Sequence, residues 1–128
     1  MKKQSLLLLA CGLFVVASFS SCLWHHRHHS SITISESGDE YQLSASFDKN
    51  KSRKIQRLLD RELGRDYDAS FQNECVDGEI SLHDRTVFYI RSLPGRLKIV
   101  FDKSENSEES GEKIRELCED IKDALEDN

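Results

Sequence analysis

Apolar and polar residues alternate in two parts of the chain, and a period of two is typical of strands with one buried face. In the first part the apolar positions are Ile32, Ile34, Tyr41, Leu43, Ala45 and Phe47. Residues 37–40, which interrupt the alternation, have the composition of a turn. The pattern therefore predicts a hairpin in which Ile34 lies opposite Leu43 and Ile32 lies opposite Ala45.

The second alternating part covers residues 85–92 and 97–102, with Pro94 and Gly95 between them. A turn at this Pro-Gly pair predicts a second hairpin. Its register pairs Ile90 with Ile99 on one face, and Tyr89 with Val100 and Arg91 with Lys98 on the other. A further strand is expected at residues 79–82.

Two other segments repeat apolar residues every three or four positions, as amphipathic helices do. The first stripe is Ile55, Leu58, Leu59 and Leu63, and the second is Ile114, Leu117, Cys118, Ile121 and Leu125. Asp48 or Asn50 is the expected N-cap of the first helix and Gly64 its end, while Asn106 with Glu109 suggests a capping box for the second. The resulting order ββαβββα predicts an α+β fold, a mainly antiparallel sheet with two helices packed on one face.

The N-terminus has the features of a targeting segment. Lys2 and Lys3 precede an apolar run over residues 5–19, and the sequence Ser20-Ser21-Cys22 follows the run. A membrane-spanning helix needs about 20 apolar residues, so this run suits a signal peptide better.

Small residues directly before a cysteine, at the end of such a run, resemble the lipobox of bacterial lipoproteins. The resemblance covers about the first 22 residues, and Phe19 stands where that family usually has Leu. It implies cleavage before Cys22 and acylation of Cys22, which would hold the protein on membrane lipid. With Leu23 rather than Asp after the cysteine, it favours the outer membrane, facing the periplasm. The alternatives are an ordinary signal peptide, which leaves Cys22 free, and a retained transmembrane anchor.

This interpretation divides the chain into a signal peptide (residues 1–21), a His-rich tether (22–31) and a small α+β domain (32–128). Cys11 is then lost with the signal peptide, and Cys75 and Cys118 remain as a pair in a compartment that permits disulfides. We expect a Cys75–Cys118 disulfide, whose loop of about 44 residues would stabilise the domain by roughly 4 kcal/mol. The alternative is two buried free thiols.

The charges are unevenly distributed. The whole chain has a formal net charge of −5, and removal of Lys2 and Lys3 with the signal peptide makes it −7. Residues 105–127 carry ten acidic and three basic side chains, whereas residues 49–65 carry seven basic and two acidic ones. Two neighbouring helices of opposite charge explain this split, and a basic helix that faces anionic lipid is the alternative. No nucleic-acid partner is expected, because the net charge is negative and no recognition motif is present.

Four histidines of the tether, His25, His26, His28 and His29, form the densest cluster of potential metal ligands. Imidazoles bind Zn, Cu or Ni, so weak binding of a divalent metal is expected there, but no other cofactor. The alternative is that this run is a polar spacer, since structural metal sites use ligands held by folded elements.

A candidate binding surface lies on the sheet face away from the helices. Tyr89 and Val100 would lie there beside Arg91 and Lys98, and aromatic and cationic side chains are enriched at interfaces. An ordinary solvent-exposed face is the alternative.

Motifs of the common hydrolases, metalloproteases and nucleotide-binding enzymes are absent from the sequence. The sequence therefore favours a membrane-anchored, non-enzymatic module that binds another protein or an envelope component. A metal-handling lipoprotein that uses the histidine run is the second hypothesis.

Overall fold

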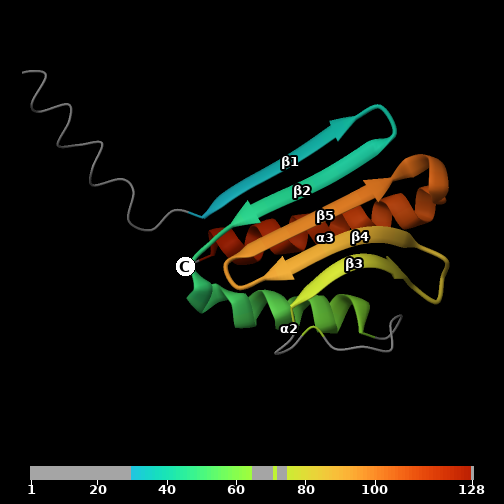
Figure 1. Ribbon diagram of the computed structural model, residues 1–128. Coiled ribbons are helices and arrows are strands. Elements are labelled where there is room, and N and C mark those ends of the chain that lie inside the picture. Colours follow the sequence, from blue (N-terminus) through green and yellow to red (C-terminus); the bar gives the residue numbers. More distant parts are fainter. Residues whose placement is uncertain (1–29, 65–70, 72–74, 128) are drawn as a thin grey trace, which may run out of the picture.

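Five antiparallel strands form one sheet, and two helices pack on one of its faces (Figure 1). The computed structural model describes residues 30–64, 71 and 75–127. The strands are β1 (Ser31–Ser37), β2 (Glu40–Ser46), β3 (Val76–Ser81), β4 (Val87–Leu93) and β5 (Arg96–Asp102), and the helices are α2 (Ser52–Leu63) and α3 (Glu108–Glu126). Short 3₁₀ turns, η1 (Lys49–Lys51) and η2 (Lys103–Glu105), lead into the helices. The predicted α+β class and the order ββαβββα are confirmed.

Both hairpins have the predicted register. Ile34 lies opposite Leu43 in β1 and β2, and Ile90 lies opposite Ile99 in β4 and β5. Each turn is shorter than expected. The strands stay paired up to the two residues that flank the turn, so only two residues form each loop. Gly38 and Gly95 adopt φ values of +55° and +75° in these loops, a conformation that favours glycine.

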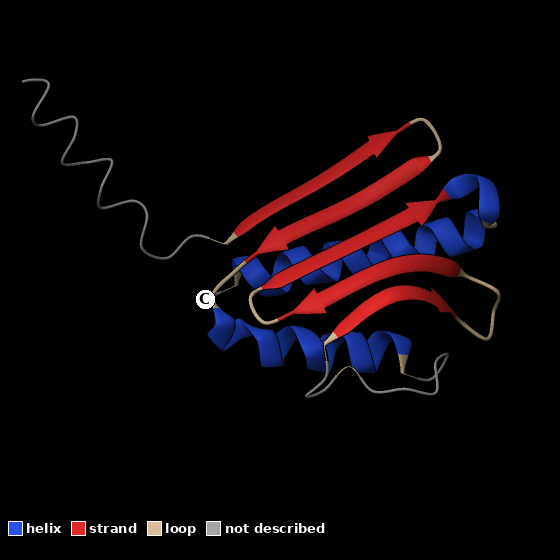
Figure 2. Ribbon diagram, viewed as in Figure 1, coloured by secondary structure: helices blue, strands red, loops and turns tan. Residues whose placement is uncertain are grey.

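The two hairpins are joined by pairing between β2 and β5, which gives the strand order β1-β2-β5-β4-β3. This pairing places Leu43 opposite Ile99 and Ala45 opposite Leu97 in the middle of the sheet. Their side chains are buried with the apolar stripes of α2 and α3, and together they form the core. The core therefore lies between the sheet and the helices, and the other face of the sheet is left outside it (Figure 2).

Side chains cap the turn η1 and the helix α3, whereas the N-cap of α2, Lys51, makes no side-chain capping bond. Asp48 accepts a hydrogen bond from the backbone N–H of Asn50 at 3.0 Å, so it is the cap of the preceding turn η1. The cap of α3 is Ser107, which accepts from the N–H of Ser110 at 3.1 Å. The prediction that Asn106 caps α3 is wrong, because its amide bonds to the backbone of β4 and β5 instead.

Candidate functional site

The candidate site is the sheet face opposite the helices, which we call the open face. Side chains point alternately to the two faces of a sheet, so this face carries the strand side chains that do not point into the core. Figure 2 shows both helices on the far side of the sheet, and no described segment covers the near side. The open face is therefore available for contact with another molecule.

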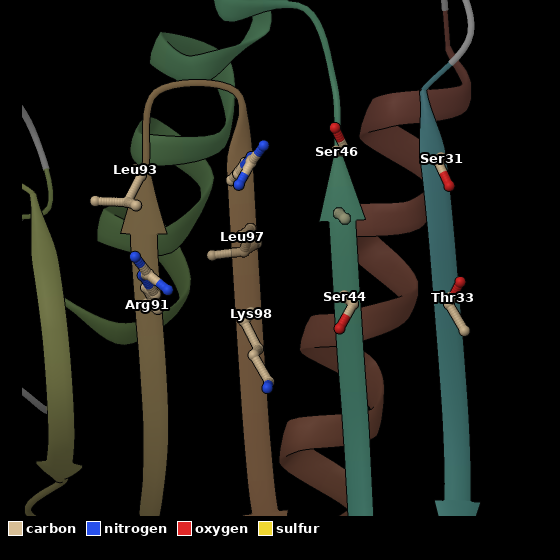
Figure 3. Close-up of a pocket in the computed structure, with 10 residues that line it drawn as sticks. Ser31, Thr33, Ser44, Ser46, Arg91, Leu93, Leu97 and Lys98 are labelled. Atoms are coloured by element: carbon tan, nitrogen blue, oxygen red, sulfur yellow. The ribbon is translucent and has the colours of Figure 1, made fainter.

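Part of the open face forms a hollow with a volume of about 270 Å³ (Figure 3). The side chains of the open face that line it are Ser31, Thr33, Ser44, Ser46, Arg91, Leu93, Arg96 and Lys98. The hydroxyls come from β1 and β2 and the cations from β4 and β5, so the hollow extends across four strands. Its lining contains no acidic side chain.

The strand register arranges these side chains in two parallel rows. One row consists of Thr33, Ser44, Lys98 and Arg91, and the next consists of Ser31, Ser46, Arg96 and Leu93. Neighbouring strands are about 4.8 Å apart, so adjacent members of a row are within reach of one ligand. Each row thus offers hydroxyls beside at least one positive charge, which is the chemistry that binds an anionic group.

On the open face, the carboxylate of Asp77 in β3 contacts two side chains of β4. Asp77 accepts a hydrogen bond from the Tyr89 hydroxyl at 2.5 Å, and this bond raises the pKa of Tyr89. The Nε of Arg91 lies 3.8 Å from the other oxygen of Asp77, with both side chains about half exposed. Such an exposed, long ion pair contributes less than about 1 kcal/mol. The guanidinium of Arg91 therefore remains accessible to a ligand in the hollow.

The predicted surface residues lie together in the structure, but the hollow of the open face includes only some of them. Tyr89 faces Val100 and Arg91 faces Lys98 across β4 and β5, as expected. Only the second pair lines the hollow, however. Sequence reasoning missed the four hydroxyl residues and Arg96, although the outward serines of the first hairpin are a signal that could have been used.

A second groove, of about 610 Å³, lies between α2 and α3. Cations of α2 line one side of it, and Asp120 and Asp123 of α3 line the other. The basic and acidic segments are therefore neighbours, as the charge distribution predicted. This arrangement accounts for the charge split within the fold.

The predicted disulfide is not present in the structure. Cys75 is an exposed free thiol before β3, and Cys118 is a buried free thiol in α3. Burial raises the pKa of Tyr41 in β2, and the nearby Cys118 adds to this rise, so Cys118 lies close to β2. In contrast, β5 and β4 separate β2 from β3. Three strand spacings amount to about 14 Å, and a disulfide tolerates a Cα separation of about 7 Å. The structure corrects the prediction because the strand order keeps the two cysteines apart.

The predicted acylation site Cys22 and the potential metal ligands His25, His26, His28 and His29 lie outside the described residues. Within residues 30–64, 71 and 75–127, no group of three or more His, Cys, Asp or Glu side chains is placed to hold a metal ion. No helix in this part of the chain is both long enough and apolar enough to cross a membrane.

Comparison with known proteins found no matching family model, no similar curated protein and no similar solved structure.

Proposed function

We propose that the chain is a lipid-anchored protein of the bacterial cell envelope that acts as a non-enzymatic binding module. Its N-terminus would be tethered through acylated Cys22, on the outer membrane and facing the periplasm. The support for the anchor is the lipobox-like sequence that ends the apolar run at Cys22. Two or more acyl chains suffice for stable attachment without any help from the folded domain.

The observation that carries the binding role is the hollow of the open face. Three cations and four hydroxyls gather there on a rigid sheet, and the helices that form the core lie on the other side. Arginine, lysine and hydroxyl side chains all donate hydrogen bonds. This lining suits the recognition of an acceptor-rich, negatively charged group, so we propose binding rather than catalysis.

The anchor is tested by metabolic labelling with a radioactive fatty acid. The wild-type chain should be processed and labelled, and the Cys22→Ala variant should be neither. Cys75→Ala is the matched control, because it removes an exposed thiol of the folded domain. Labelling that persists in Cys22→Ala would refute the anchor.

The binding face is tested by a photo-crosslinking amino acid incorporated in intact cells. We expect crosslinks to envelope components, lipid or protein, from position 33 on the open face, and none from position 116 on the exposed side of α3. Products from position 116 alone would show that the helices form the binding surface instead.

A further inference from the structure

Apart from Asp77 and Glu79 on the edge strand β3, which lie opposite Arg91 and Tyr89, the charges of the open face are separated along the strands. Arg96 and Lys98 lie in the half of β5 that follows the turn at Gly95, whereas Asp102 at its other end lies opposite Glu40 of β2. The hollow has no acidic lining residue, although the chain as a whole has a formal net charge of −5. One end of the face is thus a local positive surface on an acidic protein.

This positive end is also the end at which the chain enters the domain. Ser31 is the first residue of β1, and its side chain lines the hollow (Figure 3). Residues 23–30 alone separate Ser31 from Cys22. An extended chain spans at most about 3.5 Å per residue, so an acylated Cys22 would keep the hollow within about 30 Å of the membrane surface.

Phosphate oxygens of lipid headgroups accept hydrogen bonds from hydroxyl, ammonium and guanidinium groups. The rows of the hollow present these three donors side by side, from Ser44 and Ser46 to Lys98 and Arg96. Each basic side chain near an anionic membrane surface also favours the bound state by about fivefold. Both the donors and the charge of the hollow therefore match an anionic lipid surface.

We propose that the hollow docks on the phosphate headgroups of anionic phospholipid, so that the tethered domain lies with the positive end of its open face against the membrane. This inference rests on the lipid anchor proposed above, and it adds which face of the domain meets the bilayer. The acidic face of α3 then points away from the negatively charged surface. The cations of α2 also point away from it, and they line a groove with Asp120 and Asp123 of α3.

The test uses the full-length acylated protein in vesicles of phosphatidylcholine, with or without about one-third phosphatidylglycerol. A fluorophore is attached to Ser35→Cys, on an exposed open-face position beside the hollow, or to Glu116→Cys on α3. Both proteins carry Cys75→Ser, and the thiol of Cys118 is fully buried. Headgroup nitroxide lipids report docking, because they quench only a nearby fluorophore.

We expect the fluorophore at position 35 to be quenched in vesicles with phosphatidylglycerol, and the one at position 116 to remain bright. Raised salt should weaken this quenching, since exposed charges are screened over about 8 Å at physiological ionic strength. Arg96→Gln with Lys98→Gln should lower the ratio of docked to undocked protein about 25-fold, from about fivefold per charge. The matched control, Arg57→Gln with Arg61→Gln on exposed positions of α2, should leave the ratio within about twofold.

Three results would overturn the docking proposal while the anchor stands. These are equal quenching with and without phosphatidylglycerol, equal quenching at the two label positions, or no effect of Arg96→Gln with Lys98→Gln in protein that floats with the vesicles. An acidic protein partner on this face would give the first of them. A wild-type chain that does not float with vesicles would instead refute the anchor, and with it the orientation argued here.

Discussion

Lys51 donates a hydrogen bond from Nζ to the backbone carbonyl of Leu125, at 3.0 Å. Lys51 directly precedes α2, and Leu125 lies in the last turn of α3. The last carbonyls of a helix have no partner within the helix and carry a partial negative charge. The ammonium group therefore satisfies an acceptor and stabilises the end of the acidic helix, which connects the oppositely charged segments of the chain.

Lys51→Met should lower the free energy of unfolding by about 1–2 kcal/mol, because it removes a charge-assisted hydrogen bond and a favourable interaction with the dipole of α3. Urea denaturation measures the change. Lys54→Met, at an exposed position of α2, is the control and should change stability by less than about 0.5 kcal/mol. Equal losses in both variants would show that the contact to Leu125 is unimportant.

Asn106→Ala should be more damaging, with a loss of about 2–3 kcal/mol. Its Oδ1 accepts from the N–H of Val87 at 2.8 Å, and its Nδ2 donates to the carbonyls of Val87 at 2.9 Å and Asp102 at 2.7 Å. Alanine would leave these partly buried backbone groups without a partner. The same denaturation measurement on Asn50→Ala, an exposed asparagine, provides the reference, and a loss no larger than that of Asn50→Ala would contradict the prediction.

The two cysteines of the domain should react at very different rates with iodoacetamide. Cys75 is exposed, whereas Cys118 is buried, and burial raises the pKa of its thiol to about 12. Since the thiolate is the nucleophile, native protein should be alkylated at Cys75 and protected at Cys118 until it unfolds. Mass spectrometry of the labelled peptides measures both rates. Protection of both thiols that ends only on reduction would demonstrate a disulfide after all.

Alkaline pH should destabilise the fold. Burial raises the pKa of Tyr41 from 10.0 to about 12, and burial likewise raises that of Cys118 from 9.0 to about 12. Between about pH 9 and 12 these groups ionise first in the unfolded chain, so the stability present below this range is lost as the pH rises. Tyr41→Phe should reduce that loss by about 1 kcal/mol at about pH 11. Parallel stability profiles of the two proteins would contradict the role of Tyr41.

Replacement of His25, His26, His28 and His29 by Ser should abolish weak zinc binding and leave contacts of the open face unchanged. Zinc titration and the crosslinking from position 33 measure the two properties. In the wild-type protein, zinc binding should weaken below about pH 6, because protonated imidazoles cannot bind metal. A metal-dependent phenotype that only the histidine variant loses would favour a metal-handling role over a spacer.

Local patterns of the sequence were enough to predict the elements and much of their detail. Around Ile34 and Leu43, apolar residues alternate on both sides of a short turn. Because a short turn joins neighbouring strands, this pattern predicts the register of the first hairpin. The apolar stripe from Ile114 to Leu125 likewise predicts which side of α3 is buried. Such features follow from the periods of strands and helices, and the structure confirms them.

Pairing between the two hairpins could not be predicted in this way. The pairing of β2 with β5 depends on how two hairpins fit over the same helices, and it alone places Ser44 beside Lys98 and creates the hollow. The same strand order separates Cys75 from Cys118. Asn106, for its part, has the composition of a helix cap but lies where the backbone of β4 needs a partner. The segments and their faces are thus local properties of this chain, whereas the site on its open face exists only because packing of the whole core selects one strand order.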